Sequence, residues 1–98
     1  MTFNILSPAQ HDFSRALRWY LDDQLAPRAA NRFADEVSRI YTEIRNDPER
    51  YPPKHRGLRA WPLMKFPFFV IYRLKADDIT VAFIKHKARD AGYLRQFE

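Results

Sequence analysis

The residues best suited to chemistry lie close together near the C-terminus, in the segment Lys85-His86-Lys87-Ala88-Arg89 and at Tyr93. Three cations, an imidazole and a phenol could hold a phosphodiester, stabilise a pentavalent phosphorane and protonate a leaving oxygen. This group is the one constellation in the sequence suited to RNA cleavage without a metal. Such a basic cluster more often contacts phosphates or an acidic partner. His86 can equally serve as a strand-end hydrogen-bonder, and Tyr93 as a packing anchor.

Other common catalytic and cofactor-binding patterns are missing from the sequence. The 98 residues include no cysteine, which excludes disulfides, thiolate zinc sites and a cysteine nucleophile. The only glycines, Gly57 and Gly92, are too far apart for a phosphate-binding loop. No two histidines have the i, i+4 spacing of a helical metal site, and no serine lies in a nucleophile elbow. We therefore expect neither a metal nor a cofactor.

The positive charge of the chain is concentrated in its second half. The sequence has 17 Lys and Arg against 12 Asp and Glu, a net charge of +5. Up to Arg50, seven Arg face eight acids, a net of −1, whereas the remainder has ten basic residues and four acids, a net of +6. This asymmetry favours an anionic partner for the second half. The alternative is a solvated rim of cations that keeps the protein in solution.

A second candidate surface combines Arg59 with Trp61, because arginine and tryptophan are frequent at interfaces. The alternative is that Trp61 packs into the core under the helices.

A short strand and a first helix are predicted at the N-terminus. Residues 2–6 alternate polar and apolar side chains, which indicates a strand. Ser7-Pro8-Ala9-Gln10 is typical of a helix start, with Ser7 as the N-cap residue. Apolar residues then recur at helical spacing to about Leu25, with Asp12 outside their stripe.

A second helix follows at once. Pro27 ends the first helix and can open the next, whose apolar repeat continues until Asn46-Asp47-Pro48. The very short connection predicts an antiparallel helical hairpin over about residues 8–46.

The remaining sequence predicts three strands and a tail. Three prolines make residues 47–57 an extended linker. Strands are expected at 58–63, 68–74 and 79–84, the last two joined by a hairpin turn. In the basic tail, residues 87–98, Gly92 disfavours a helix before Tyr93. The predicted order is β-α-α-β-β-β. It describes a single α+β domain, residues 1–98, whose hairpin packs on one face of a mostly antiparallel sheet, mainly residues 58–86.

No targeting or membrane segment is visible. The N-terminus lacks a basic region followed by a long apolar stretch. The longest nearly apolar run, Phe66 to Tyr72, is too short to span a bilayer as a helix. We expect a cytoplasmic protein that does not enter a membrane.

Several segments together resemble the RelE/ParE superfamily of toxins from toxin–antitoxin systems. They are Trp19-Tyr20, then Arg59-x-x-x-Leu63-x-Lys65-Phe66-Pro67-Phe68 through Ile71-Tyr72, and Ile84-x-His86-x-x-Arg89. The resemblance covers nearly the whole chain, and the family's fold agrees with the predicted order of elements. Phe66-Pro67-Phe68 and His86-x-x-Arg89 resemble the ParE-like, plasmid-stabilisation branch.

The resemblance implies a growth-inhibiting protein that a cognate acidic or amphipathic antitoxin neutralises. ParE-like members poison DNA gyrase without a recognised hydrolytic site, and this is the activity we expect. RelE-like members cut mRNA in the ribosome, and this endoribonuclease activity is the alternative. A plain nucleic-acid binder is a third reading. A homodimer is compatible with the sequence.

Residue by residue, the match to RelE-like nucleases is partial. Lys87 and Tyr93 keep the six-residue spacing between their basic residue and tyrosine, but a lysine cannot make the two-pronged phosphate contact of an arginine. Lys65 is the only counterpart of a further arginine. In the ribonuclease alternative His86 and Tyr93 act as acid and base, while Lys87 and Arg89 hold phosphate. In the preferred reading, the residues that contact the target or the antitoxin are Arg59, Trp61, Arg73, Lys85, Lys87, Arg89 and Arg95.

Overall fold

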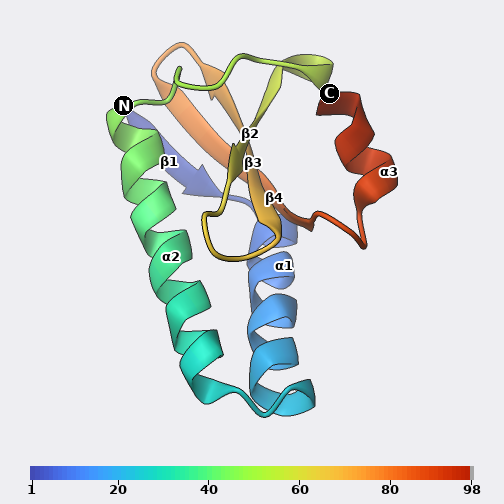
Figure 1. The fold of residues 1–98 in the computed structure, drawn as a ribbon. Coiled ribbons are helices and arrows are strands. Elements are labelled where there is room, and N and C mark those ends of the chain that lie inside the picture. The colour runs from blue at the N-terminus through green and yellow to red at the C-terminus, as the bar shows by residue number, and fades with distance from the viewer. Residues whose placement is uncertain (98) are drawn as a thin grey trace.

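The computed structural model describes residues 1–97 and has two layers, a helical hairpin and a four-stranded sheet, with a short C-terminal helix beyond the sheet (Figure 1). In chain order the elements are β1 (Thr2–Ile5), α1 (Ser7–Arg18), a π-helical turn (Trp19–Asp23), α2 (Pro27–Asn46), a 3-10 turn (His55–Gly57), β2 (Leu58–Pro62), β3 (Phe68–Lys75), β4 (Asp78–His86), α3 (Ala91–Leu94) and a last 3-10 turn (Arg95–Phe97).

The sheet has the order β1-β4-β3-β2. β1 pairs with β4 in parallel, and the other two pairings are antiparallel. The prediction of an α+β fold with a helical hairpin on a mostly antiparallel sheet is therefore confirmed. Successive residues of a strand point to opposite faces, so one face of β3 meets the hairpin while the other faces the C-terminal segment.

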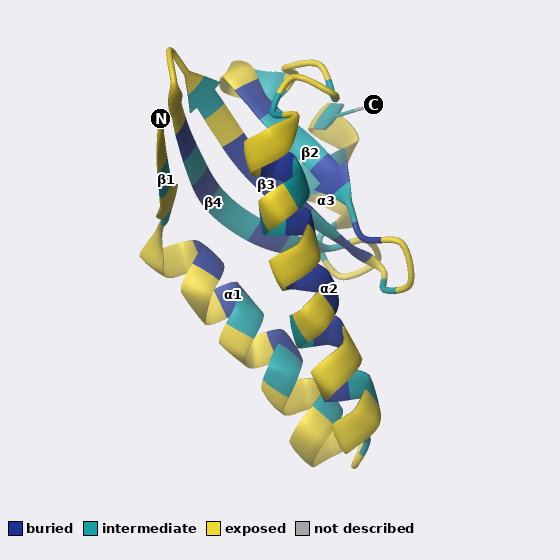
Figure 2. Ribbon diagram, turned by 90° about the vertical axis from the view of Figure 1, so that its left-hand side faces the viewer, coloured by how far each residue is buried: buried dark blue, intermediate teal, exposed yellow. Residues whose placement is uncertain are grey.

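The core lies between the hairpin and the sheet, where the buried residues of both layers face each other (Figure 2). Phe33 of α2 is fully buried, and its ring centroid lies 5.2–5.6 Å from those of Phe13, Phe66 and Phe68. The apolar repeat of α2 supplies further buried residues at 3.6-residue spacing, as its sequence predicts, and α1 adds Ala9 and Ala16.

The predicted cap of α1 is wrong. Ser7 is the first residue of the helix, Leu6 is its N-cap, and no side chain caps the helix. The reason is that the backbone of Leu6 stays extended beyond β1, since its N–H donates to the carbonyl of Val81 at 2.9 Å. The Gln10 side chain turns back to the carbonyl of Ile5 instead.

The end of the first helix also differs from the prediction, which extended it to about Leu25. The α-helix ends at Arg18 and widens into a π-helical turn, in which the N–H of Gln24 donates to the carbonyl of Trp19. Leu25 then has φ 48°, a left-handed conformation that lets the chain reverse before Pro27. The apolar periodicity does not distinguish an α turn from a wider one.

The prediction that Gly92 disfavours a helix before Tyr93 is wrong. Both residues belong to α3, whose Leu94 N–H donates to the carbonyl of Asp90 at 3.0 Å. The ring of Tyr93 packs against Phe83 and Phe97, with centroids 5.9 and 5.7 Å apart. These contacts outweigh the cost of about 1 kcal/mol for a glycine in a helix.

One carboxylate ties the two layers together. Glu36 of α2 is buried and accepts hydrogen bonds from the backbone N–H groups of Met64 and Lys65, at 2.5 and 3.2 Å. Both residues lie in the loop between β2 and β3, which is thereby attached to the hairpin.

Candidate functional site

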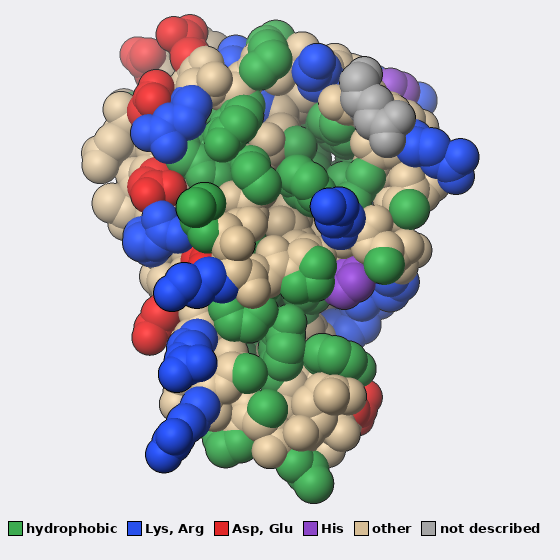
Figure 3. Space-filling view, viewed as in Figure 1, with side chains coloured by type: hydrophobic (Ala, Val, Ile, Leu, Met, Phe, Trp, Pro, Cys, Tyr) green, Lys and Arg blue, Asp and Glu red, His purple; other side chains and the backbone are tan. Residues whose placement is uncertain are grey.

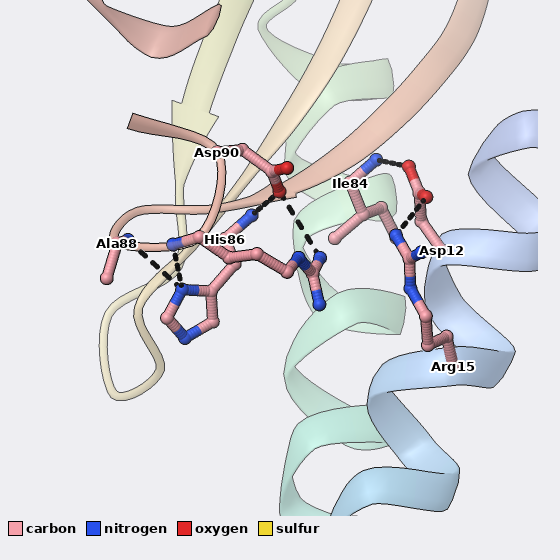
Figure 4. A network of polar contacts seen from close by, with 7 residues as sticks. Asp12, Arg15, Ile84, His86, Ala88 and Asp90 are labelled. Atoms are coloured by element: carbon pink, nitrogen blue, oxygen red, sulfur yellow. Dashed lines mark hydrogen bonds and ion pairs between the residues drawn. The ribbon is translucent and has the colours of Figure 1, made fainter. Parts of the chain in front are cut away.

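The turn that follows β4 is organised by two side chains (Figure 4). Asp90 accepts a hydrogen bond from the N–H of His86 at 2.8 Å and one from the Arg89 guanidinium at 3.2 Å. Nδ1 of His86 accepts from the N–H groups of Ala88 and Arg89, at 3.0 and 3.1 Å. Because both partners are donors, the proton of the neutral imidazole lies on Nε2. His86 thus shapes the turn that presents the cations.

The pKa of the Asp90 carboxyl is lowered by its surroundings in this turn. Burial alone would raise its pKa, but the hydrogen bonds from the His86 backbone and the Arg89 side chain, with the nearby charges of Arg89 and Lys85, lower it overall. The turn therefore combines a fixed negative charge with the surrounding cations.

A second carboxylate, that of Asp12, contacts β4 at Ile84, two residues before His86. β1 pairs with β4 only as far as Val81, which leaves the N–H of Ile84 without a strand partner. The buried Asp12 of α1 accepts this N–H at 2.9 Å and also pairs with Arg15 at 3.2 Å. The sequence placed Asp12 outside the apolar stripe and gave no sign of this contact.

The ribonuclease candidates line separate spaces. His86 and Arg89 line a cavity of about 220 Å³ together with Ala16, Trp19 and Phe68. Lys65 and Lys87 line another cavity, of about 320 Å³, along the loop between β2 and β3. Tyr93 lines neither cavity and packs between Phe83 and Phe97. Neither of these two cavities is lined by all five side chains.

Tyr93 carries its proton more firmly than an ordinary tyrosine. Burial raises the pKa of its phenol, and the positive charge of Arg56 offsets only part of this effect. The hydroxyl is therefore protonated at neutral pH.

Three of the predicted contact residues, Arg59, Arg73 and Lys85, make contacts within the molecule. Arg59 is partly buried, and its guanidinium donates to the carbonyl of Tyr51 at 2.7 Å. Arg73 donates to the carbonyl of Arg56 at 3.1 Å. These two arginines attach the linker to β2 and β3. Lys85 places its ammonium 4.6 and 5.3 Å from the ring centroids of Phe83 and Tyr93, which are cation–π distances.

Trp61 is buried with 2% of its surface exposed, so the structure agrees with the core alternative for this residue. Its ring meets Tyr51 edge-on at 5.0 Å, and the Arg50 guanidinium lies 4.6 Å from its centroid. The remaining predicted contact residues are all exposed: Lys87, Arg89 and Arg95.

A larger cavity, of about 610 Å³, lies on the sheet face opposite the hairpin. Residues of the linker, β2, β3 and the C-terminal segment line it, and we call it the C-terminal cavity. The sequence patterns did not indicate a functional role for its residues Lys54, Leu94 and Phe97. The available signal was the proline-rich linker, whose residues Tyr51, Pro52 and Lys54 line the cavity. Figure 3 shows apolar side chains over the middle of the face viewed, with Lys and Arg on both sides.

Among residues 1–97, no group of three His, Asp or Glu side chains is placed to hold a metal ion. None of the helices in this range has the length and apolar composition needed to cross a membrane.

The chain has the fold of the RelE/ParE-like toxins, as the sequence resemblance implied. This fold consists of one strand, a helical hairpin, three further strands and a basic C-terminal segment. The family described as the ParE toxin of the type II toxin–antitoxin system parDE matches residues 4–91. The chain belongs to this family. The match confirms the predicted ParE-like branch.

A solved structure has a similar fold. It is described as a chromosomal ParDE TA system from P. aeruginosa, and it aligns with a TM-score of 0.75 at 18% sequence identity. The alignment covers 88% of this chain and 95% of the other. No curated protein matches the chain.

Proposed function

We propose that this ParE-family toxin arrests growth in the cytoplasm by binding and inhibiting DNA gyrase. The observation that carries the proposal is its membership of the ParE toxin family over residues 4–91. The placement of the ribonuclease candidates supports it, because His86 and Arg89 line a different cavity from Lys65 and Lys87. A binding protein needs no convergent acid, base and phosphate-holding groups, whereas a nuclease does.

We further propose that an acidic, amphipathic antitoxin neutralises the toxin. The similar structure is itself described as a ParDE system. On this chain, the cavity between α1 and the turn after β4 has an apolar floor, Ala16 and Phe68, beside the exposed Trp19 and the cation of Arg89. An amphipathic helix could place an apolar anchor in this cavity and an acidic residue over Arg89.

The direct test is a supercoiling assay with purified toxin and purified gyrase. We expect the toxin to inhibit supercoiling at stoichiometric ratios, and Lys87→Glu or Arg95→Glu to weaken the inhibition at least about tenfold, because like charges at an interface repel. Lys75→Glu is the matched control. It makes the same charge change at the exposed last residue of β3, whereas the C-terminal cavity lies near the start of that strand, at Phe69. Unaffected supercoiling at excess toxin would make gyrase the wrong target.

Primer extension on transcripts from expressing cells tests the ribonuclease alternative. We expect no cuts in phase with codons. Codon-phased cuts that vanish in the Tyr93→Phe variant would establish the RelE-type activity instead.

A further inference from the structure

The C-terminal cavity has an apolar interior. Its floor is formed by side chains of β2 and β3 on the face away from the hairpin, namely Ala60, Pro62 and Phe69. Leu94 and Phe97 of the C-terminal segment form one wall. The volume of about 610 Å³ falls within the range typical of ligand pockets.

The wall is held in place by an aromatic stack. Phe97 packs on Tyr93 and Tyr93 packs on Phe83 of β4, with centroids 5.7 and 5.9 Å apart. Lys85 lies over the rings of Phe83 and Tyr93. These contacts hold the C-terminal segment beside the sheet, so the cavity is formed before any partner binds.

Three cations surround this apolar interior. Lys54 comes from the linker, Lys87 from the turn after β4 and Arg95 from the C-terminal segment. All three are exposed, and the described lining residues include no carboxylate. The opening therefore attracts a negatively charged partner.

The interior distinguishes between two kinds of anionic partner. Apart from the Tyr51 phenol, the described side chains facing it are aliphatic, proline or phenyl groups below the rim of cations. A nucleobase has several donors and acceptors on its edges, and burying them here without partners would cost free energy. A large apolar amino-acid side chain gains free energy from the same burial and leaves no polar group unpaired.

We propose that the C-terminal cavity binds an acidic peptide segment of a protein partner, with one large apolar side chain inserted between β2, β3 and Phe97 and with carboxylates over Lys54, Lys87 and Arg95. This proposal deepens the proposed function, on which it rests, because it gives the recognition chemistry of the basic surface.

The test is calorimetric titration of the full chain with a synthetic peptide in which Asp and Glu flank a single Phe. A second peptide has Gly in place of Phe, and an oligouridine of equal charge is the third probe. We expect saturable binding of the first peptide and binding of the Gly peptide that is weaker by about tenfold or more, the effect of one buried apolar side chain. Affinity for the Phe peptide should also fall as salt rises.

Variants localise the binding. Ala60→Leu places a larger side chain on the cavity floor, where the Phe ring would lie, and we expect it to remove the preference for Phe over Gly. Ala88→Leu, exposed in the turn after β4, is the matched control and should leave the preference unchanged. Phe97→Ala removes one of the two wall side chains, outside the core, and should also reduce the preference if Ala60→Leu does not fold. Lys54→Glu should weaken the Phe peptide about tenfold, and Lys75→Glu much less.

Two results would overturn the proposal. Equal affinity for the Phe and Gly peptides would leave only a charged surface, and tighter binding of the oligouridine would make the partner a nucleic acid. A toxin that inhibits gyrase but does not bind the Phe peptide retains the proposed function and loses this inference. Peptide binding with unaffected supercoiling would refute gyrase as the target and leave the cavity assignment in place.

Discussion

The two faces of the sheet are covered in different ways. Toward the hairpin, Val70 and Ile79 are fully buried against α1 and α2 together with Phe33. On the opposite face, Phe69 and Phe83 are only partly buried beside the C-terminal segment. The first face supplies most of the apolar burial that stabilises the fold, whereas the second leaves a cavity open for a partner. The same β3 strand serves both purposes because its side chains alternate between the faces.

Truncating an aromatic ring on each face should give the largest difference. Phe33→Ala removes a ring packed among four other aromatic rings and should lower the free energy of unfolding by about 3–5 kcal/mol. Phe97→Ala, near the end of the chain, should cost less than about 1 kcal/mol. Urea unfolding of both variants measures this. Equal losses would contradict the assignment of stability to the hairpin face.

A pH series compares a tyrosine from each face. Burial raises the pKa of Tyr72 to about 12, outweighing the nearby charge of Arg59. Between pH 10 and 12 the unfolded chain loses this proton while the folded chain keeps it, so stability falls as pH rises. Tyr72 should account for about 2 kcal/mol of the loss by pH 12. Unfolding at pH 9 and 12 should show a smaller loss in Tyr72→Phe than in the parent.

Tyr93→Phe is the matched variant on the cavity face. Burial also raises the pKa of Tyr93, but the charge of Arg56 counteracts it, so removing this phenol should flatten the pH profile less. A larger effect from Tyr93 than from Tyr72 would reverse the comparison.

The carboxylate that joins the loop between β2 and β3 to the hairpin should have an intermediate effect. Glu36→Gln loses the charge that strengthens two hydrogen bonds and should cost about 1–2 kcal/mol. Hydrogen exchange at the Met64 amide should accelerate about tenfold. The exposed neighbour Asp35→Asn is the control and should change neither quantity. An unchanged exchange rate in Glu36→Gln would show that the loop is held by other contacts.

The smallest effect is expected on the outer surface of the hairpin. Arg39 and Glu43 form an exposed ion pair at 2.6 Å, one helical turn apart. Arg39→Ala should change the free energy of unfolding by less than about 0.5 kcal/mol, because solvent screens such pairs. Repeating the measurement at high salt should reduce even this difference. If Arg39→Ala lowered the free energy of unfolding by more than about 1 kcal/mol, the outer surface of the hairpin would contribute more to stability than we expect.

The order of elements and the hairpin face were predictable from sequence because periodicity encodes them. The repeat from Ala30 to Ile44 gives the buried stripe of α2, and prolines and turn residues mark most boundaries. Local rules failed where a long-range contact decides the outcome. Leu6 stays extended because of Val81, and α3 forms around Gly92 because Tyr93 packs on Phe83.

The candidate site was predictable in composition and not in arrangement. A basic cluster was predictable from the residue types alone. Adjacent residues on a strand end and a turn point to different sides, however, so His86 and Lys87 line different cavities. The C-terminal cavity combines the linker with residues more than thirty positions later, such as Leu94. Its existence depends on how the C-terminal segment packs, which no local pattern describes.

The bonds made by Asp12 and Asp90 have a consequence for the toxin as a free molecule. Beyond Val81, β4 has no strand beside it on the β1 side. Without other partners, the N–H groups of Ile84 and His86 would form a sheet edge to which another chain could add by strand pairing. Both groups are already bonded to these carboxylates. These two bonds leave the edge fewer free donors for strand pairing with a second copy of the chain.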